Sequence, residues 1–297
     1  MKRRFFLLSF LFISILTSAQ VNLEDSKVSI VAYWDVGDEM VYEYRRQDMD
    51  IIGNDTLPSK EPTHIEQFSL EVIDSTTEGY TIKYTLLDYK HVILNNGVEK
   101  EVDMPWQSFS KGTTATIRTN KLGELIEVGH WDIPRNENED NIAKEVVGDD
   151  PFSKISHVAD LFNYYGTVVY KDSIRSWYDK MPSDWNDEFI DVDCAVSAFD
   201  ETDDKEFIRI VHVLKPDSEQ LTENHKAHFS QLDVNPVFLE QLSTLSAQIV
   251  TQFTLHDPSG WIVEYLSERK TTMAKKTTLS IWEIRILFED ETDFYQK

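Results

Sequence analysis

The chain of 297 residues contains a single cysteine, Cys194, and only 10 glycines. One cysteine cannot form an internal disulfide, so a fold held together by disulfides is excluded. Ile190, Val192, Val196 and Ala198 lie at alternate positions around it, which places the thiol on the apolar face of a strand. We therefore expect a buried, unreactive cysteine rather than a catalytic nucleophile.

Positive charge is also scarce, with 29 Lys and Arg against 53 Asp and Glu and a net charge of -24. Such a surface repels phosphate backbones and anionic head groups, so nucleic-acid binding is not expected. The sequence has no Gly-rich phosphate loop and no Gly-x-Ser-x-Gly nucleophile motif. These absences indicate no cofactor and give no support for a specific enzyme class.

Long apolar runs are absent after residue 19, so no membrane span is expected in the mature chain. The first residues do contain a shorter run, Phe5–Leu16, preceded by Lys2, Arg3 and Arg4. Small residues follow this run and end at Ala19. This order of basic, apolar and small residues is typical of a secretory signal peptide, here spanning residues 1–19. We expect an exported protein, and the short polar C-terminal tail favours the periplasm over full secretion.

Alternating apolar and polar residues dominate the remaining sequence. Phe68, Leu70 and Val72 are followed by a polar turn and then by a second alternating run, Tyr80–Leu86. Two such runs with a short link predict a β-hairpin with one buried face. Asn95-Asn96-Gly97 predicts a second hairpin, because a type I′ turn needs positive φ at both central residues.

Further strands are predicted by the same alternation. The run Leu279–Phe288 is apolar on both faces, which is typical of a central or doubly covered strand. The other predicted strands are Met40–Arg45, Thr114–Arg118, Glu124–Val128, Gly166–Tyr170, Phe189–Phe199, Phe207–Leu214, Ile249–Leu255 and Trp261–Leu266.

Helical periodicity is confined to two inserts. Asp150 can cap a helix that begins at Pro151 and ends near Gly166. A second helical insert near 217–247 begins at Asp217, and Asn235-Pro236 predicts a further cap within it. We therefore expect a β-rich α+β fold of antiparallel sheets, one per half or merged, with two helical inserts.

The chain divides into a β-rich half at 20–135, an acidic linker and helix at 136–166, a second β-rich half at 167–290, and a polar tail at 291–297. The two halves share an order of features: a strand, a short acidic turn, another strand and a Gly-containing hairpin. This order favours two related halves, although any succession of β-hairpins produces some of it.

The turn motifs resemble those of a group of uncharacterised β-rich exported proteins of Bacteroidetes. The resemblance is carried by the signal ending at Gln20, the Gly37-Asp38 strand start, the Asp74–Tyr80 hairpin and the Asp257–Gly260 turn. It spans most of the chain between Tyr33 and Phe288. The second half departs from it, with Lys171 where the first half has Gly37. The resemblance implies no known activity and no catalytic residues.

Aromatic residues supply the main candidate site. The chain has 7 Trp, 12 Tyr and 16 Phe. Side chains at alternate strand positions could form an aromatic face in the hollow of a curved sheet, binding an apolar or sugar ligand. The alternative is that the same rings form the core between sheet and helices. The candidate residues are Tyr42, Tyr44, Tyr80, Tyr84, Trp261 and Tyr265.

A metal site has one weak candidate, the pair His225 and His228. At i and i+3 they could share one face of a helix and hold zinc with a third ligand from elsewhere. The HExxH arrangement is absent, so solvated histidines on a polar helix are the simpler interpretation.

Three functions remain open from the sequence. The favoured hypothesis is a non-enzymatic periplasmic binding or carrier protein for a lipid or other apolar ligand, by analogy with lipoprotein carriers and lipocalin-like shells. The alternative is a cell-envelope interaction module that binds a protein or glycan partner through its acidic surface. The third is an exported hydrolase, with metal dependence through His225 and His228 as one version of it.

Overall fold

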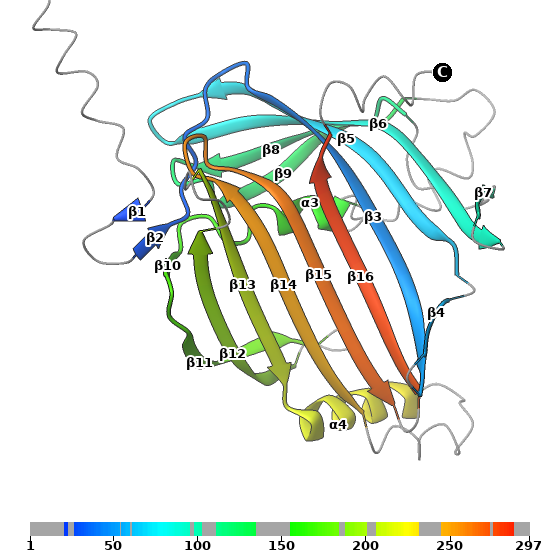
Figure 1. Cartoon of the computed structure of the whole chain (residues 1–297). Helices are drawn as coiled ribbons and strands as arrows, with labels where there is room; N and C mark the ends of the chain where they lie inside the picture. Colours follow the sequence, from blue (N-terminus) through cyan, green and yellow to red (C-terminus); the bar gives the residue numbers. More distant parts are fainter. Residues whose placement is uncertain are drawn as a thin grey trace, which may run out of the picture.

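The structure is a computed structural model. It describes residues 21–22, 27–53, 55–59, 61–95, 98–102, 111–134, 155–183, 188–200, 206–231, 245–273 and 276–287. The predicted signal peptide, most of the acidic linker and the polar tail lie outside these residues. Figure 1 shows that the described part is dominated by one large antiparallel sheet.

This sheet has 13 strands, and its main path runs β11-β12-β13-β14-β15-β16-β3-β5-β6-β8-β9. Short strands extend two of them, with β4 paired to β3 and β7 paired to β6. The strands are β3 (Glu39–Ile52), β4 (Asp55–Pro58), β5 (Thr63–Ser75), β6 (Gly79–Asn95), β7 (Val98–Glu101), β8 (Thr114–Asn120), β9 (Leu125–Asp132), β11 (Arg175–Pro182), β12 (Phe189–Asp200), β13 (Phe207–Pro216), β14 (Ser246–His256), β15 (Trp261–Met273) and β16 (Lys276–Ile286).

The remaining described elements are small. Strands β1 (Val21–Asn22), β2 (Lys27–Ser29) and β10 (Val168–Tyr170) form a separate three-stranded sheet. The two described helices are α3 (Ser156–Asp160) and α4 (Ser218–Ser230). Neither described helix has the length and apolar character needed to cross a membrane.

The prediction of a β-rich fold with antiparallel sheets is confirmed, whereas the α+β class and the relation between the two halves are not. Strand β16 pairs with β3, so the two halves share one continuous sheet instead of forming one each. β16 is a central strand, as the apolar run from Leu279 predicts. Strand β11 has no counterpart among the predicted strands, because most of its residues are exposed and its sequence shows little alternation.

The predicted helices are realised in part. The first covers only the five residues of α3, and residues 151–154 lie outside the described structure. In the second insert, Asp217 is the N-cap of α4 and accepts a 2.8 Å hydrogen bond from the Gln220 amide, as its sequence position predicts. The predicted cap at Asn235-Pro236 lies outside the described residues.

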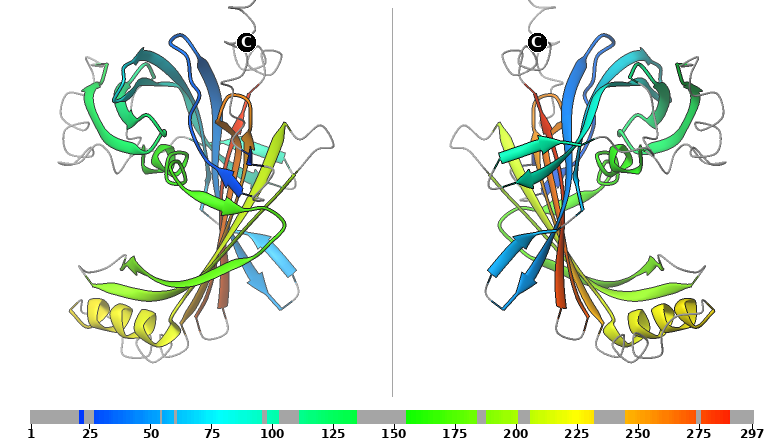
Figure 2. Two further views of the ribbon diagram at one scale, coloured as in Figure 1. Left: turned by 90° about the vertical axis from the view of Figure 1, so that its left-hand side faces the viewer. Right: turned by 90° about the vertical axis from the view of Figure 1, so that its right-hand side faces the viewer.

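The sheet is strongly bent, and both of its ends curl toward the same side (Figure 2). The α3 segment lies in the concave side near one end of the strands, and α4 lies at the other end. The concave face is therefore covered at two separate places along the strands.

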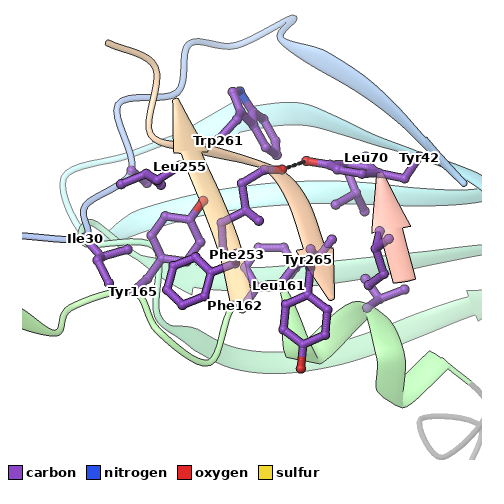
Figure 3. Packing of buried hydrophobic residues seen from close by; sticks show 14 of the residues in the cluster. Ile30, Tyr42, Leu70, Leu161, Phe162, Tyr165, Phe253, Leu255, Trp261 and Tyr265 are labelled. Atoms are coloured by element: carbon purple, nitrogen blue, oxygen red, sulfur yellow. Dashed lines mark hydrogen bonds between the residues drawn. The ribbon is translucent and has the colours of Figure 1, made fainter. Parts of the chain in front are cut away.

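The main core lies between this concave face and two covering segments (Figure 3). Strand residues at alternate positions, such as Phe68, Leu70 and Ile82, face inward because strand side chains alternate with a period of two. The α3 segment contributes Leu161 and Phe162, which lie among the strand side chains in Figure 3. The N-terminal segment 28–34 also enters this core.

Trp34 is the centre of this second covering segment. Its ring stacks on Trp261 with a centroid separation of 4.6 Å and meets Tyr80 and Tyr165 at 5.2 Å each. Tyr80 and Trp261 belong to strands from different halves, so one side chain joins both halves of the chain.

Candidate functional site on the concave face of the sheet

The six aromatic residues predicted to form a ligand face do share one place, but they are buried within the main core. Their side chains expose 7% of their surface or less: Tyr42, Tyr44, Tyr80, Tyr84, Trp261 and Tyr265. The Tyr42 hydroxyl donates to the Ile262 carbonyl at 3.0 Å (Figure 3), and Tyr80 donates to the Ala32 carbonyl at 3.3 Å. The covering segments therefore occupy the space beside these rings.

A row of mostly polar side chains crosses the concave face next to this core. Its members are directly paired residues of nine neighbouring strands. Because strand side chains alternate between the two faces, each member points to the same face as the core residue two positions away on its strand. From β6 to β11 the row is His91, His64, Arg46, Trp282, Ser267, Thr251, His212, Val196 and Arg175. This row marks where the fully buried part of the concave face ends.

At one side of the row, Glu66 lies at the centre of a buried polar cluster. Its carboxylate is 6% exposed and accepts a 2.8 Å hydrogen bond from the Tyr84 hydroxyl. Nε2 of His157, on α3, lies 3.1 Å from the same oxygen, and His64 Nε2 lies 3.3 Å from the other. His64 also contacts His91, with 3.1 Å between ring nitrogens.

Burial alone would raise the pKa of the Glu66 carboxyl. The charge and hydrogen bond of His157, with those of His64, outweigh burial and lower the pKa to about 2. The His157 ring also stacks on Tyr44 at 4.0 Å. The cluster therefore fastens α3 to strands β3, β5 and β6 through one ionised carboxylate.

Asp160, at the end of the same helix, has the opposite environment. Burial raises the pKa of its carboxyl to about 6, although the charge of His157 and a hydrogen bond from Asn163 act to lower it. Two carboxyl groups near one histidine thus differ by several pKa units because only Glu66 receives several hydrogen bonds.

At the other side of the row, a pocket of about 390 Å³ opens between the α3–β10 segment and strands β11–β13. Val169 and Val196, both buried, form its floor. The half-buried Tyr164, Trp177 and His212 form its walls. Exposed residues surround its mouth: Asn163, Thr167, Val168 and Arg175. Its volume is within the range of small-molecule sites.

His212 is the polar group of the pocket wall. The Tyr164 hydroxyl lies 3.2 Å from its Nδ1, and the Trp177 ring stacks on the imidazole at 5.7 Å. Nε2 is buried and has no hydrogen-bond partner in the described structure. Burial lowers the pKa of His212, so the ring is neutral at pH 7.

Beyond the polar row, the concave face is apolar again on strands β11–β14. Trp177, Cys194, Leu214 and Ile249 are successive paired residues there. Cys194 is buried and free, as predicted, and burial raises its pKa. Helix α4 covers the far end of this surface, where Leu221 packs in a small second core.

His225 and His228 lie on α4 and are not part of the concave-face row. Nδ1 of His225 lies 2.9 Å from the Leu221 carbonyl of the same helix. Within the described residues, no group of three or more His, Cys, Asp or Glu side chains is arranged to hold a metal ion.

Sequence reasoning did not identify the Glu66 cluster or the pocket. One signal was available for the cluster: His64 and Glu66 occupy alternate positions directly before the predicted strand at Phe68. His91 was hidden by an irregularity, because the pairing of β5 with β6 shifts between Gln67 and Phe68 and skips Leu87. The shift brings His91 to the concave face, where simple alternation from Tyr84 would place Lys90.

No family model matches the chain, and no curated protein matches it either. Among solved structures, one described as "Lipid-protein interactions in lipovitellin" is similar with a TM-score of 0.48 and 9% identity, over 86% of this chain and 25% of that chain. The chain thus spans about a quarter of that protein. The attachment invasion locus protein Ail of Yersinia pestis is similar with a TM-score of 0.17 and 5% identity, over 86% of this chain and all of that chain. Similarities at this level assign neither a family nor a function to the chain.

Proposed function

We propose that this protein is a non-enzymatic binding or carrier protein for an apolar small molecule. The observation that carries the proposal is the 390 Å³ pocket, whose floor and walls are mainly aliphatic and aromatic. Buried apolar surface contributes about 25 cal/mol per Å², so such a pocket favours an apolar occupant.

The position of the pocket supports the same function. Its lining residues come from both the sheet and the covering segment 155–169. The size of ligand that fits therefore depends on how this segment covers the sheet. Tyr164 lines the pocket and also packs on Phe253 of the main core, with ring centroids 4.3 Å apart. The rigid core therefore holds one wall in place, which limits the ordering cost of binding.

The proposed place of action is outside the cytoplasm, with the periplasm favoured. The charge, apolar run and small residues of positions 1–19 support export. Relationship to uncharacterised exported proteins of Bacteroidetes belongs to the same proposal. It rests on the signal segment and the turn motifs.

The decisive experiment is native mass spectrometry of residues 20–297, purified from periplasm without detergent. We expect an added mass that organic solvent removes and that identifies the ligand class. Val168→Trp at the pocket mouth should reduce the occupied fraction, since Val168 is 46% exposed and lines the opening.

The matched control is Val98→Trp, because Val98 is also an exposed strand valine, on β7, and does not line the pocket. This variant should keep the added mass. A clean mass for the unmodified protein, with no uptake of added lipids, would contradict the carrier function. It would favour the alternative of a cell-envelope interaction module.

A further inference from the structure

The mouth of the pocket carries a positive charge with no ionic partner among the described residues. This charge belongs to Arg175, which lies at the start of edge strand β11 and lines the opening. The described contact of its side chain is with the Tyr170 ring, whose centroid lies 5.8 Å from the guanidinium carbon. No carboxylate of the described structure pairs with it, in a chain with 53 acidic residues.

The surroundings of Arg175 keep this charge available. None of the described residues that line the pocket carries a carboxyl group. Arg175 is the one Lys or Arg side chain among the described lining residues, on a molecule of strongly negative net charge.

Apolar and charged parts of the pocket are also arranged in sequence from floor to mouth. Val169 and Val196 are 4% and 8% exposed, whereas Arg175 is exposed at the rim. An apolar chain lying on the valines would leave its end group at the rim. A guanidinium binds a carboxylate there with two parallel hydrogen bonds.

We infer that the ligand is an amphiphile with one apolar chain and a terminal carboxylate, held by Arg175 at the mouth and by Val169 and Val196 at the floor. This inference rests on the proposed carrier function and names its ligand class. His212 supplies a second polar group along the wall. Its Nδ1 lies 3.2 Å from the Tyr164 hydroxyl, and its buried Nε2 has no hydrogen-bond partner among the described residues.

The experiment compares decanoate with decanol by isothermal titration calorimetry on residues 20–297. The two probes share a chain and differ in the end group. We expect decanoate to bind about fivefold more tightly, the upper end of the range for a solvent-accessible ion pair. The preference should fall as salt concentration rises.

Arg175→Gln should weaken decanoate binding and reduce the ratio of the two dissociation constants to less than about twofold. Arg175→Lys should restore part of the preference, since it returns the charge without the planar fork. The control is Arg118→Gln, because Arg118 pairs with Glu127 on exposed strand positions away from the pocket. This variant should keep the preference of the unmodified protein.

The outcomes separate the two proposals. Equal binding of both probes to the unmodified protein would overturn the carboxylate inference and leave the carrier function standing. Equal weakening of both probes by Arg175→Gln would mean that Arg175 only shapes the pocket, which also overturns the inference. If neither probe binds, the carrier function fails together with the inference that rests on it.

Discussion

At the scale of single residues, the two carboxyl groups beside His157 have opposite effects on folding. Glu66 is ionised and accepts hydrogen bonds from Tyr84 and both neighbouring histidines. Asp160 is largely withdrawn from water with one hydrogen-bond donor, Asn163. Removing one member of a buried, well-paired charge cluster costs several kcal/mol. Replacing a buried charge that has few partners by a neutral isostere can instead stabilise the fold.

Glu66→Gln should destabilise the protein by about 3 kcal/mol at pH 7, because it removes the charge that pairs with His157 and His64. A lowered folded-state pKa stabilises the fold above the unfolded value of 4.5, and this contribution is lost as the pH falls toward 2. Urea unfolding between pH 2 and 7 would measure both effects. Glu127→Gln at an exposed pair should change stability by less than about 0.5 kcal/mol.

Asp160→Asn should stabilise the protein by about 1–2 kcal/mol at pH 7. The pKa of Asp160 is raised to about 6, so the folded state binds this proton more tightly than the unfolded state does. Stability is therefore lost as the pH rises from about 4 to 6, and the amide variant lacks this loss. The same unfolding series should show the gain disappearing below pH 4. A gain that persists at pH 3 would contradict the argument.

At the scale of elements, the turn between β8 and β9 is built to dock on the covering segments. The Asn120 side-chain oxygen accepts hydrogen bonds from the Leu122 and Glu124 amides. The Leu122 carbonyl accepts from the Ala32 amide of the N-terminal segment. Gly123 has a φ of +96° and lies directly against the Tyr165 ring, where a Cβ atom would approach within 2.7 Å.

Gly123→Ala should therefore cost about 2 kcal/mol more than Gly37→Ala. Gly37 also has a φ of +96°, but nothing lies within 4 Å of its Cβ position. Both variants have the same backbone strain, so the difference isolates the contacts with Tyr165 and Ala32 of the covering segments. Chemical denaturation of the two variants provides the comparison. Equal losses would mean that the turn does not press on the covering segment.

At the scale of the whole molecule, the pairing of β16 with β3 makes one sheet from both halves of the chain. Trp34 joins the halves a second time through Tyr80 and Trp261. Extensive shared structure of this kind favours a single cooperative unfolding transition. The free Cys194 in the second half provides a natural probe, because its buried thiol reacts only when β12 opens.

We expect labelling of Cys194 to follow the far-UV circular dichroism transition in urea. The same should hold for Ala115→Cys in a Cys194→Ala background, since Ala115 is buried on β8 in the first half. Ser176→Cys in that background is the control and should label without denaturant, because Ser176 is exposed. If one buried cysteine became labelled at a urea concentration well below the circular dichroism transition of the same variant, the halves would unfold separately.

Several features of the fold could be predicted from local sequence. Alternation from Phe68 to Val72 and from Tyr80 to Leu86 fixes which residues face the core, because strand side chains have a period of two. Asp217 predicts the start of α4, because an N-cap carboxylate satisfies free backbone amides within the next three residues. These signals depend only on neighbours in the chain.

The candidate site depended on contacts that no local pattern contains. The six aromatic residues all lie in the main core, and the segments 28–34 and 155–169, which cover them, are distant in sequence. The pocket joins Tyr164 to Trp177, Val196 and His212 across different elements. Its position follows from where the covering segment ends, which is a result of packing.

The sequence by itself determined most of the long strands, their inward faces, the buried cysteine and the acidic surface, since each depends on the composition or spacing of nearby residues. The tertiary structure decided the single merged sheet, the burial of the predicted aromatic face and the grouping of Glu66 with His157. It also placed Arg175 at the mouth of an apolar pocket, with no ionic partner in the part of the chain that the structure describes. The physical reason is that burial, desolvation and charge pairing depend on side chains brought together from distant strands.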